Sequence, residues 1–329
     1  MNLLMLKNRI FNISSEAEFE KTALEVFRFQ YHNNKVYRQF CQLLSIDSNA
    51  VRGINHIPFL PVEFFKSHRI LSSEKTPEIT FTSSGTTGSS TSKHHVTSLK
   101  IYEESFIQGF EHFYGKPEDL VIFALLPSYL ERQGSSLIYM AEKLISRSKH
   151  KESGFYLNEL QELAGKLIEL DQSGKKILLI GVSFALLDLV ENFSFNLQNT
   201  TIMETGGMKG RRKEMIRKEL HQILAKGFGV DRIHSEYGMT ELLSQAYSKG
   251  SGVFECPPWM KILIRDPEDA LEILPENKNG GINIIDLANL NSCSFLATQD
   301  LGKNLSNNTT EILGRFDNSD IRGCNLMVL

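Results

Sequence analysis

The chain has 329 residues, of which 41% are hydrophobic, and a formal net charge of −3 at pH 7. This length can bury about three quarters of the unfolded surface, and no apolar run approaches the roughly 20 residues that span a bilayer. Four scattered cysteines without a Cys-x-x-Cys pair argue against a zinc site and a disulfide scaffold, and the absence of a basic stripe argues against nucleic-acid binding. We therefore expect a cytoplasmic globular protein that is not an integral membrane protein.

Residues 1–75 have a helical pattern. Ser15 can cap a helix, since Glu18 follows three residues later and apolar residues then recur at helical spacing. In the apolar stretch 57–66, a regular helix is excluded until after Pro61. We expect this segment to pack on the core that follows, with 57–66 as a packed connector.

Residues 76–256 alternate short apolar runs with helical patterns, which is typical of an α/β fold with buried parallel strands. The expected strands are 120–126, 177–182, 200–203 and 232–234. The expected helices are 135–147, 184–193 and 211–226, the last ending at Gly227. In such sheets ligands bind beyond the carboxyl ends of the strands. From about residue 257 the pattern changes to short strands and turns, so we expect 257–329 to form a small β subdomain.

A run of glycines and hydroxyl side chains closed by a lysine follows the strand-like stretch 78–81. It contains the candidate phosphate ligands Thr82, Ser83, Ser84, Gly85, Thr86, Thr87, Gly88 and Lys93. Glycine residues allow the backbone N–H groups to converge on an anion. The hydroxyl groups and the lysine ammonium supply further hydrogen-bond donors. The spacing is not that of a Walker loop, because Lys93 comes five residues after Gly88. The alternative reading is a Ser/Thr-rich linker.

Three further motifs follow. In 235–241, the Tyr237 ring can stack on a purine, the Thr240 hydroxyl can bond a phosphate oxygen and the Glu241 carboxylate can bind magnesium. Asp300 can accept hydrogen bonds from both ribose hydroxyls, and Arg315 lies in a Gly-Arg-Phe-Asp motif.

These motifs, taken in order, resemble the core motifs of the adenylate-forming acyl ligase superfamily. They are residues 82–93, 237–241, 298–300 and 314–317. Stretches 58–66 and 126–137 and the short length most resemble the LuxE-type fatty acyl-protein synthetases. The resemblance implies an α/β fold of the adenylate-forming large-domain type, with stacked sheets and a small C-terminal β subdomain. It also leads us to expect that the mobile domain of ordinary members is missing.

The resemblance further implies ATP and magnesium as cofactors. Residues 83–93, with Thr82, would hold the β- and γ-phosphates, and Glu241 would bind the metal. Tyr237 beside Gly238 would stack on adenine, Thr240 would contact the α-phosphate, and Asp300 and Arg315 would hold the ribose and the nucleotide edge. Gly206 and Gly207 would line the adenine and acyl pockets. The catalytic lysine of the missing domain would be replaced by Lys93, His94 or Lys209, or by a cation from a partner subunit.

The acyl acceptor implied by the resemblance is Cys324, because acyl-protein synthetases are acylated on a cysteine near the C-terminus and a thiolate attacks an acyl-adenylate readily. The alternative interpretation is that Cys324 is a buried structural cysteine. The substrate would be a carboxylic acid, with a fatty acid favoured, and an acceptor protein, carrier protein or reductase could be a partner. Two alternatives stay open: a coenzyme A ligase or acyltransferase half that works with a partner subunit, and a non-catalytic nucleotide-binding scaffold.

The two histidines that follow Lys93 allow two interpretations. His94 and His95 could touch phosphate, but we favour a polar loop surface.

Overall fold

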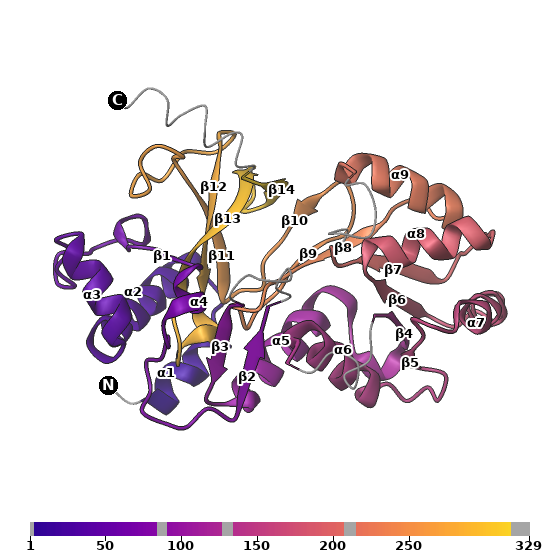
Figure 1. Ribbon diagram of the computed structural model, residues 1–329, viewed down its shortest axis with the longest axis horizontal. Coiled ribbons are helices and arrows are strands. Elements are labelled where there is room, and N and C mark those ends of the chain that lie inside the picture. Colours follow the sequence, from indigo (N-terminus) through magenta and orange to yellow (C-terminus); the bar gives the residue numbers. More distant parts are fainter. Residues whose placement is uncertain (1–2, 84–90, 127–133, 207–214, 317–329) are drawn as a thin grey trace. The chain divides into compact units, whose positions relative to one another are not determined.

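The computed structural model describes residues 3–83, 91–126, 134–206 and 215–316. The chain divides into two compact units (Figure 1). The first contains Met1–Ser105, Thr240–Ser244 and Glu255–Leu329, and the second contains Phe106–Met239 and Gln245–Phe254. The expected segments 1–75 and 257–329 thus fall in the same unit. The boundary lies within α5 (Leu99–Tyr114).

The first unit is built on an antiparallel sheet whose strands follow the order β14-β13-β12-β11. These strands are β11 (Met260–Arg265), β12 (Asn279–Asp286), β13 (Phe295–Asn304) and β14 (Thr310–Arg315), and η3 (Leu287–Asn289) follows β12. The short strand β1 (Leu60–Pro61) pairs with β13 in parallel. The hairpin of β2 (Ile79–Thr82) and β3 (Lys93–Val96) belongs to the same unit.

The predicted helical character of the N-terminal segment is seen, and its helices share a unit with this C-terminal sheet. They are α1 (Leu3–Ile10), α2 (Glu16–Asn33) and α3 (Lys35–Leu43), followed by η1 (Ile54–His56) and α4 (Phe64–Ser67). The predicted N-cap is confirmed, because the Ser15 hydroxyl accepts a hydrogen bond from the backbone N–H of Glu18. Phe27 of α2 lies edge-on to Phe295 of β13 at a centroid distance of 6.1 Å.

The predicted connector is confirmed as well. Leu60 is fully buried where β1 joins β13, and helical structure resumes only after Pro61, at Phe64.

The second unit contains a mainly parallel sheet in the order β5-β4-β6-β7-β8-β9 (Figure 1). Its strands are β4 (Val121–Leu125), β5 (Gly154–Phe155), β6 (Ile177–Gly181), β7 (Thr200–Glu204), β8 (His234–Tyr237) and β9 (Ala246–Ser248), and β10 (Val253–Phe254) follows. Only the pairing of β8 with β9 is antiparallel. Every residue of β4 and β6 is buried, which explains their uninterrupted apolar sequences.

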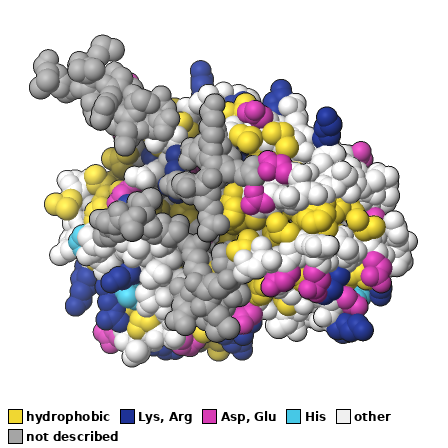
Figure 2. All heavy atoms as spheres, turned by 45° about the vertical axis from the view of Figure 1, so that its right-hand side comes forward, with side chains coloured by type: hydrophobic (Ala, Val, Ile, Leu, Met, Phe, Trp, Pro, Cys, Tyr) yellow, Lys and Arg dark blue, Asp and Glu magenta, His cyan; other side chains and the backbone are white. Residues whose placement is uncertain are grey.

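Helices alternate with these strands, as the sequence predicts. They are η2 (Pro117–Asp119), α6 (Ser136–Arg147), α7 (Leu160–Gln172), α8 (Ser183–Asn192) and α9 (Arg217–Phe228). The second unit also exposes large hydrophobic side chains, including Ile216 at 71%. Figure 2 shows hydrophobic side chains in a band on the face of this unit that is turned to the viewer. No helix among the described ranges is long and apolar enough to cross a membrane.

The expected end of the last of these helices was wrong. Helix α9 continues through Gly227 to Phe228, and the capping residue is Gly229, whose φ of 68° is left-handed. Its N–H donates to the carbonyl of Ala225. The helix ends here because glycine reaches this conformation without strain.

We expect Gly229→Ala to lower the free energy of unfolding by about 2–4 kcal/mol, measured by urea denaturation. An added Cβ would lie 2.7 Å from the Asn196 Cα, and a left-handed alanine is strained. The matched control is Gly174→Ala, where φ is +77° and the added Cβ meets nothing within 4 Å. It should cost only about 1–2 kcal/mol. Equal losses in the two variants would contradict the steric explanation.

Candidate active site

The hairpin of β2 and β3 forms the base of the predicted phosphate loop. Thr82 pairs with Lys93, the Ser83 N–H donates to the Ser92 carbonyl at 3.2 Å, and the Ser92 N–H donates to the Ser83 hydroxyl at 3.0 Å. Thr82, Ser83 and Lys93 are therefore brought together. The other loop residues predicted to bind phosphate, Ser84, Gly85, Thr86, Thr87 and Gly88, lie outside the described residues.

His94 follows Lys93 and is fully buried, so the expected polar surface is wrong for this residue. Its Nδ1 lies 2.8 Å from the Thr240 carbonyl oxygen, and its Nε2 lies 3.1 Å from Asn289 Oδ1. The Asn289 Nδ2 in turn donates to the Glu241 carbonyl at 2.7 Å. Burial lowers the pKa of His94 to about 4, so the ring is neutral at physiological pH. The neutral ring carries one N–H and can donate to only one of these two oxygens. Both of its nitrogens face protein atoms, so His94 fixes the hairpin beside Thr240 and Asn289 rather than contacting phosphate.

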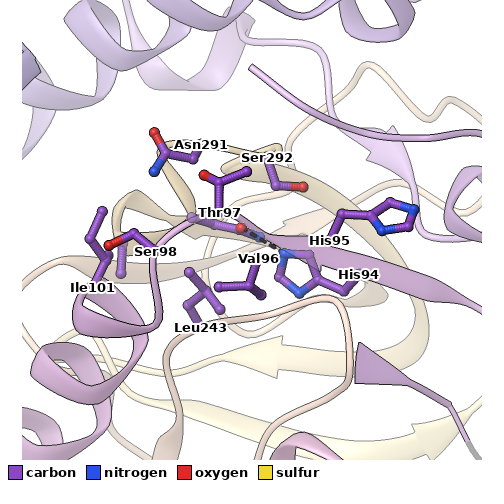
Figure 3. A pocket seen from close by; sticks show the side chains of 11 residues that line it. His94, His95, Val96, Thr97, Ser98, Ile101, Leu243, Asn291 and Ser292 are labelled. Carbon is purple, nitrogen blue, oxygen red and sulfur yellow. Dashed lines mark hydrogen bonds between the residues drawn. The ribbon is translucent and has the colours of Figure 1, made fainter. Parts of the chain in front are cut away.

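A small cavity lies beside this histidine (Figure 3). Its lining includes His94, Thr97, Leu243 and Asn289, and the buried Thr97 hydroxyl has no partner among the described residues. His95 leaves β3 on the opposite side from His94 (Figure 3), and its Nδ1 lies 2.9 Å from the Thr80 hydroxyl. Of the described nucleotide candidates, Lys93, Glu241 and Asp300 do not line this cavity.

Glu241 lies beside the end of the predicted phosphate loop. Its side chain is buried, and burial raises its pKa. A hydrogen bond from the Ser92 side chain and the nearby charges of Arg315 and Lys66 act in the opposite direction. The raised pKa of Glu241 therefore reflects burial that outweighs these three neighbours.

Asp300 and Arg315 are brought together as well. They face each other across β13 and β14, and Arg315 Nε lies 3.5 Å from Asp300 Oδ1. The Arg315 side chain is 61% exposed, so this ion pair is worth at most about 1 kcal/mol to stability. The pair instead matters for position, because it places a carboxylate and a guanidinium together at one end of the sheet.

The remaining described candidates belong to the second unit. The Tyr237 ring lies 6.1 Å from the ring of Phe254, centroid to centroid. Gly206 adopts a φ of 63° and its N–H donates to the Glu204 carboxylate at 2.8 Å. A Cβ on Gly238 would lie 2.5 Å from Glu236 Oε1, so a side chain is excluded there unless Glu236 moves. Gly207 and Cys324 lie outside the described residues.

One buried carboxylate and one partly buried carboxylate in this unit, Glu204 and Glu236, were not predicted as site residues. The Glu204 carboxylate lies 3.5 Å from both Arg217 Nε and His221 Nε2. Burial raises its pKa, but hydrogen bonding to His221 and the Arg217 charge outweigh burial and lower it to about 2. Glu236 accepts a 2.6 Å hydrogen bond from the Thr205 hydroxyl, and burial together with the Glu204 charge raises its pKa to about 7. Only the pairing of β7 with β8 brings them together, so no sequence spacing indicates them.

We expect Glu236→Gln to stabilise the protein at pH 8. The unfolded carboxyl ionises near pH 4.5 and the folded one near pH 7, so folding opposes ionisation and stability falls as the pH rises between these values. The isosteric amide removes this cost, raising the free energy of unfolding by up to about 3 kcal/mol at pH 8, with no difference below pH 4. Urea denaturation across pH measures the effect. Glu169→Gln, at an exposed site in α7, is the control, and a pH-independent difference for Glu236→Gln would contradict the assignment.

A magnesium ion fits the described donors only together with a nucleotide. No group of three or more His, Cys, Asp or Glu side chains within the described ranges is arranged to hold a metal. Mg²⁺ is commonly held by one or two carboxylates plus substrate phosphates. Glu241, close to the loop end at Ser92, is suited to supply that carboxylate.

The sequence matches the family described as "Acyl-protein synthetase, LuxE" over residues 1–329. The chain belongs to this family. It is 26% identical over 326 residues to the long-chain-fatty-acid–luciferin-component ligase of Vibrio harveyi, in a match that covers 91% of this chain and 84% of that protein. The predicted family and its enzymatic, ligase character are thereby confirmed.

Solved structures with the same fold are adenylate-forming ligases. An open 2-hydroxyisobutyryl-CoA ligase with 2-HIB-AMP and CoA aligns with a TM-score of 0.66 at 13% identity, covering 93% of this chain and 72% of that chain. ATP-bound MatB from Rhodopseudomonas palustris aligns with a TM-score of 0.54 at 16% identity, covering 74% of this chain and 48% of that chain. The predicted fold class is therefore confirmed.

Proposed function

We propose that this protein activates a carboxylic acid with ATP, forms an acyl-adenylate, and passes the acyl group to the thiol of Cys324. One observation carries the adenylation half of the proposal: His94, next to Lys93 of the predicted phosphate loop, lies 2.8 Å from the Thr240 carbonyl oxygen and so holds the loop base beside Glu241, the predicted metal ligand. The family and the fold support the same chemistry. The name of the Vibrio harveyi relative favours a long-chain fatty acid as the substrate.

In the first step, a carboxylate oxygen of the acid attacks the α-phosphorus of ATP, and the bond from that phosphorus to the bridging oxygen of pyrophosphate breaks. Ser83 and Lys93 at the loop base hold the phosphates. Glu241 would hold a magnesium ion, which would neutralise phosphate charge. Thr240, bonded to His94 through its carbonyl, keeps its hydroxyl for the α-phosphate. Asp300 accepts hydrogen bonds from the ribose.

In the second step, the Cys324 thiolate attacks the acyl carbonyl carbon. The bond to the adenylate oxygen breaks, and AMP leaves with that oxygen. A thioester forms that keeps the acyl group activated for a further acceptor. In this proposal the adenine contacts are those that the resemblance implies. Tyr237 beside Gly238 stacks on the adenine ring, and Gly206 and Gly207 line the adenine and acyl pockets.

The nucleotide product tests this proposal. With ATP labelled at the α-phosphate, we expect labelled AMP to accumulate only when a long-chain fatty acid is present. Formation of labelled ADP instead would indicate transfer of the γ-phosphate and would exclude adenylation. The two alternatives give other products: a coenzyme A ligase half would make acyl-CoA once its partner is added, and a nucleotide-binding scaffold would bind ATP without turnover.

A further inference from the structure

The helix α4 begins close to the Asp300–Arg315 pair. Strand β1 pairs in parallel with β13, Pro61 lies opposite Ala297, and the Val62 N–H donates to the Ala297 carbonyl at 3.0 Å. Because the strands are parallel, the chain leaving Pro61 runs toward Asp300. The sheet edge that β1 occupies is continued by β14, which pairs with β13 from Asn304 back to Asp300.

The other side of α4 packs against the base of the predicted phosphate loop. Phe65 is buried, and its ring lies edge-on to the His94 imidazole at a centroid distance of 5.5 Å. His94 is bonded to the carbonyl of Thr240, so α4, β3 and the Thr240–Glu241 segment form one packed assembly. In Figure 1, α4 lies next to β3. The position of Lys66 is therefore fixed by a buried neighbour, not by a free loop.

Lys66 itself is exposed, one residue after the buried Phe65. The contact of Phe65 with His94, which itself lies against the Thr240 carbonyl, places the segment that carries Lys66 beside the Thr240–Glu241 segment. In agreement with this placement, the Lys66 charge, like that of Arg315, opposes the effect of burial on the pKa of Glu241. Among the residues that the structure describes, none forms an ion pair with this ammonium. Two further exposed cations, Arg69 and Lys93, both act on the neighbouring His95. Arg69 and Lys93 thus add positive charge near His95 at the hairpin base.

We infer that Lys66 is a phosphate ligand of the adenylation site and that its ammonium stabilises the pyrophosphate leaving group. This inference rests on the proposed function. When the bond between the α-phosphorus and the bridging oxygen breaks, the electron pair stays on the pyrophosphate oxygen. A compact ammonium on a flexible stem can follow that developing charge, and a charge-assisted hydrogen bond there is worth about 1.5–3 kcal/mol. Together with Lys93, Lys66 gives this unit two cations for the phosphates.

The test uses magnesium pyrophosphate as the probe and the full-length chain. We expect Lys66→Ala to weaken its binding, measured by isothermal titration calorimetry, about 10- to 100-fold, and to slow pyrophosphate exchange by a similar factor. Lys66→Arg keeps the charge and should recover most of the affinity. Lys75→Ala removes an exposed lysine of the same unit and should change neither measurement. The binding lost in Lys66→Ala should also be salt-dependent, which a packing defect would not produce.

Wild-type affinity for pyrophosphate in Lys66→Ala would overturn the inference, and so would a wild-type protein that does not bind magnesium pyrophosphate. If the wild type binds pyrophosphate but shows no acid-dependent exchange, the proposed adenylation is wrong. The pyrophosphate affinities of the wild type and of Lys66→Ala still decide the role of Lys66. Equal losses in Lys66→Ala and Lys66→Arg would indicate a structural role and contradict phosphate binding.

Discussion

Glu241→Gln is expected to lower the rate of ATP–pyrophosphate exchange about 100- to 1,000-fold, equivalent to about 2.7–4 kcal/mol of transition-state stabilisation. The amide keeps the shape of the side chain but removes the charge that would hold magnesium. Higher magnesium concentrations should recover part of the rate, because the lost interaction is with the metal. Exchange assays over a magnesium titration measure both effects.

The fold should survive this change. Burial raises the pKa of Glu241, so the ionised carboxylate is not a source of stability at neutral pH. Glu311→Gln is the matched control, because it removes a carboxylate of the same unit that forms an ion pair with Lys303. An unchanged rate with an unchanged magnesium dependence in Glu241→Gln would refute the metal-binding assignment.

Cys324→Ser is expected to abolish covalent acylation of the protein. Incubation with ATP, magnesium and a long-chain fatty acid should add one acyl group to the wild type, seen by intact-protein mass spectrometry and removed by hydroxylamine. The serine variant should gain no mass. Its pyrophosphate exchange should stay within about threefold of wild type, because adenylation precedes transfer to the thiol.

The three described cysteines are poor alternatives to Cys324. Burial raises the pKa of Cys41 and of Cys256 to about 12 and raises that of Cys293 as well, so their thiolates are scarce at neutral pH. Cys256 is the only one of these three with appreciable exposure, which makes Cys256→Ser the appropriate control. An adduct that persists in Cys324→Ser and disappears in Cys256→Ser would show that the acceptor was misassigned.

The sequence predicts the α/β unit well because its signals are local. The buried strands β4 and β6 are continuous apolar runs, and their neighbours at 200–204 and in α6 and α8 show equally regular spacing. The predicted strand at 232–234 is shifted to 234–237. Analysis of the sequence named neither β5 nor α7. The end of α9 was misplaced by two residues because Gly227 and Gly229 are both plausible stops, and only the φ of Gly229 decides between them.

Analysis of the sequence named candidate site residues where a motif stands alone, and it named none where the candidates depend on distant strands that meet. The Asp300–Arg315 pair depends on a hairpin register between neighbouring strands, and both motifs were identified. The role that we infer for Lys66 depends on β1 pairing with a strand more than 230 residues later, which no local pattern reveals. His94 was misread because a histidine next to a lysine and a Ser/Thr run resembles a surface loop, whereas strand alternation directs its side chain inward.

The most direct test of adenylation is the acid-dependent exchange of labelled pyrophosphate into ATP. We predict exchange with long-chain fatty acids in the presence of magnesium, none without an acid, and slower exchange with aromatic acids. Exchange is diagnostic because it requires a reversible step that releases pyrophosphate while the acyl-adenylate stays bound. Absence of exchange across both fatty and aromatic acids, with folded protein and magnesium ATP present, would contradict the account.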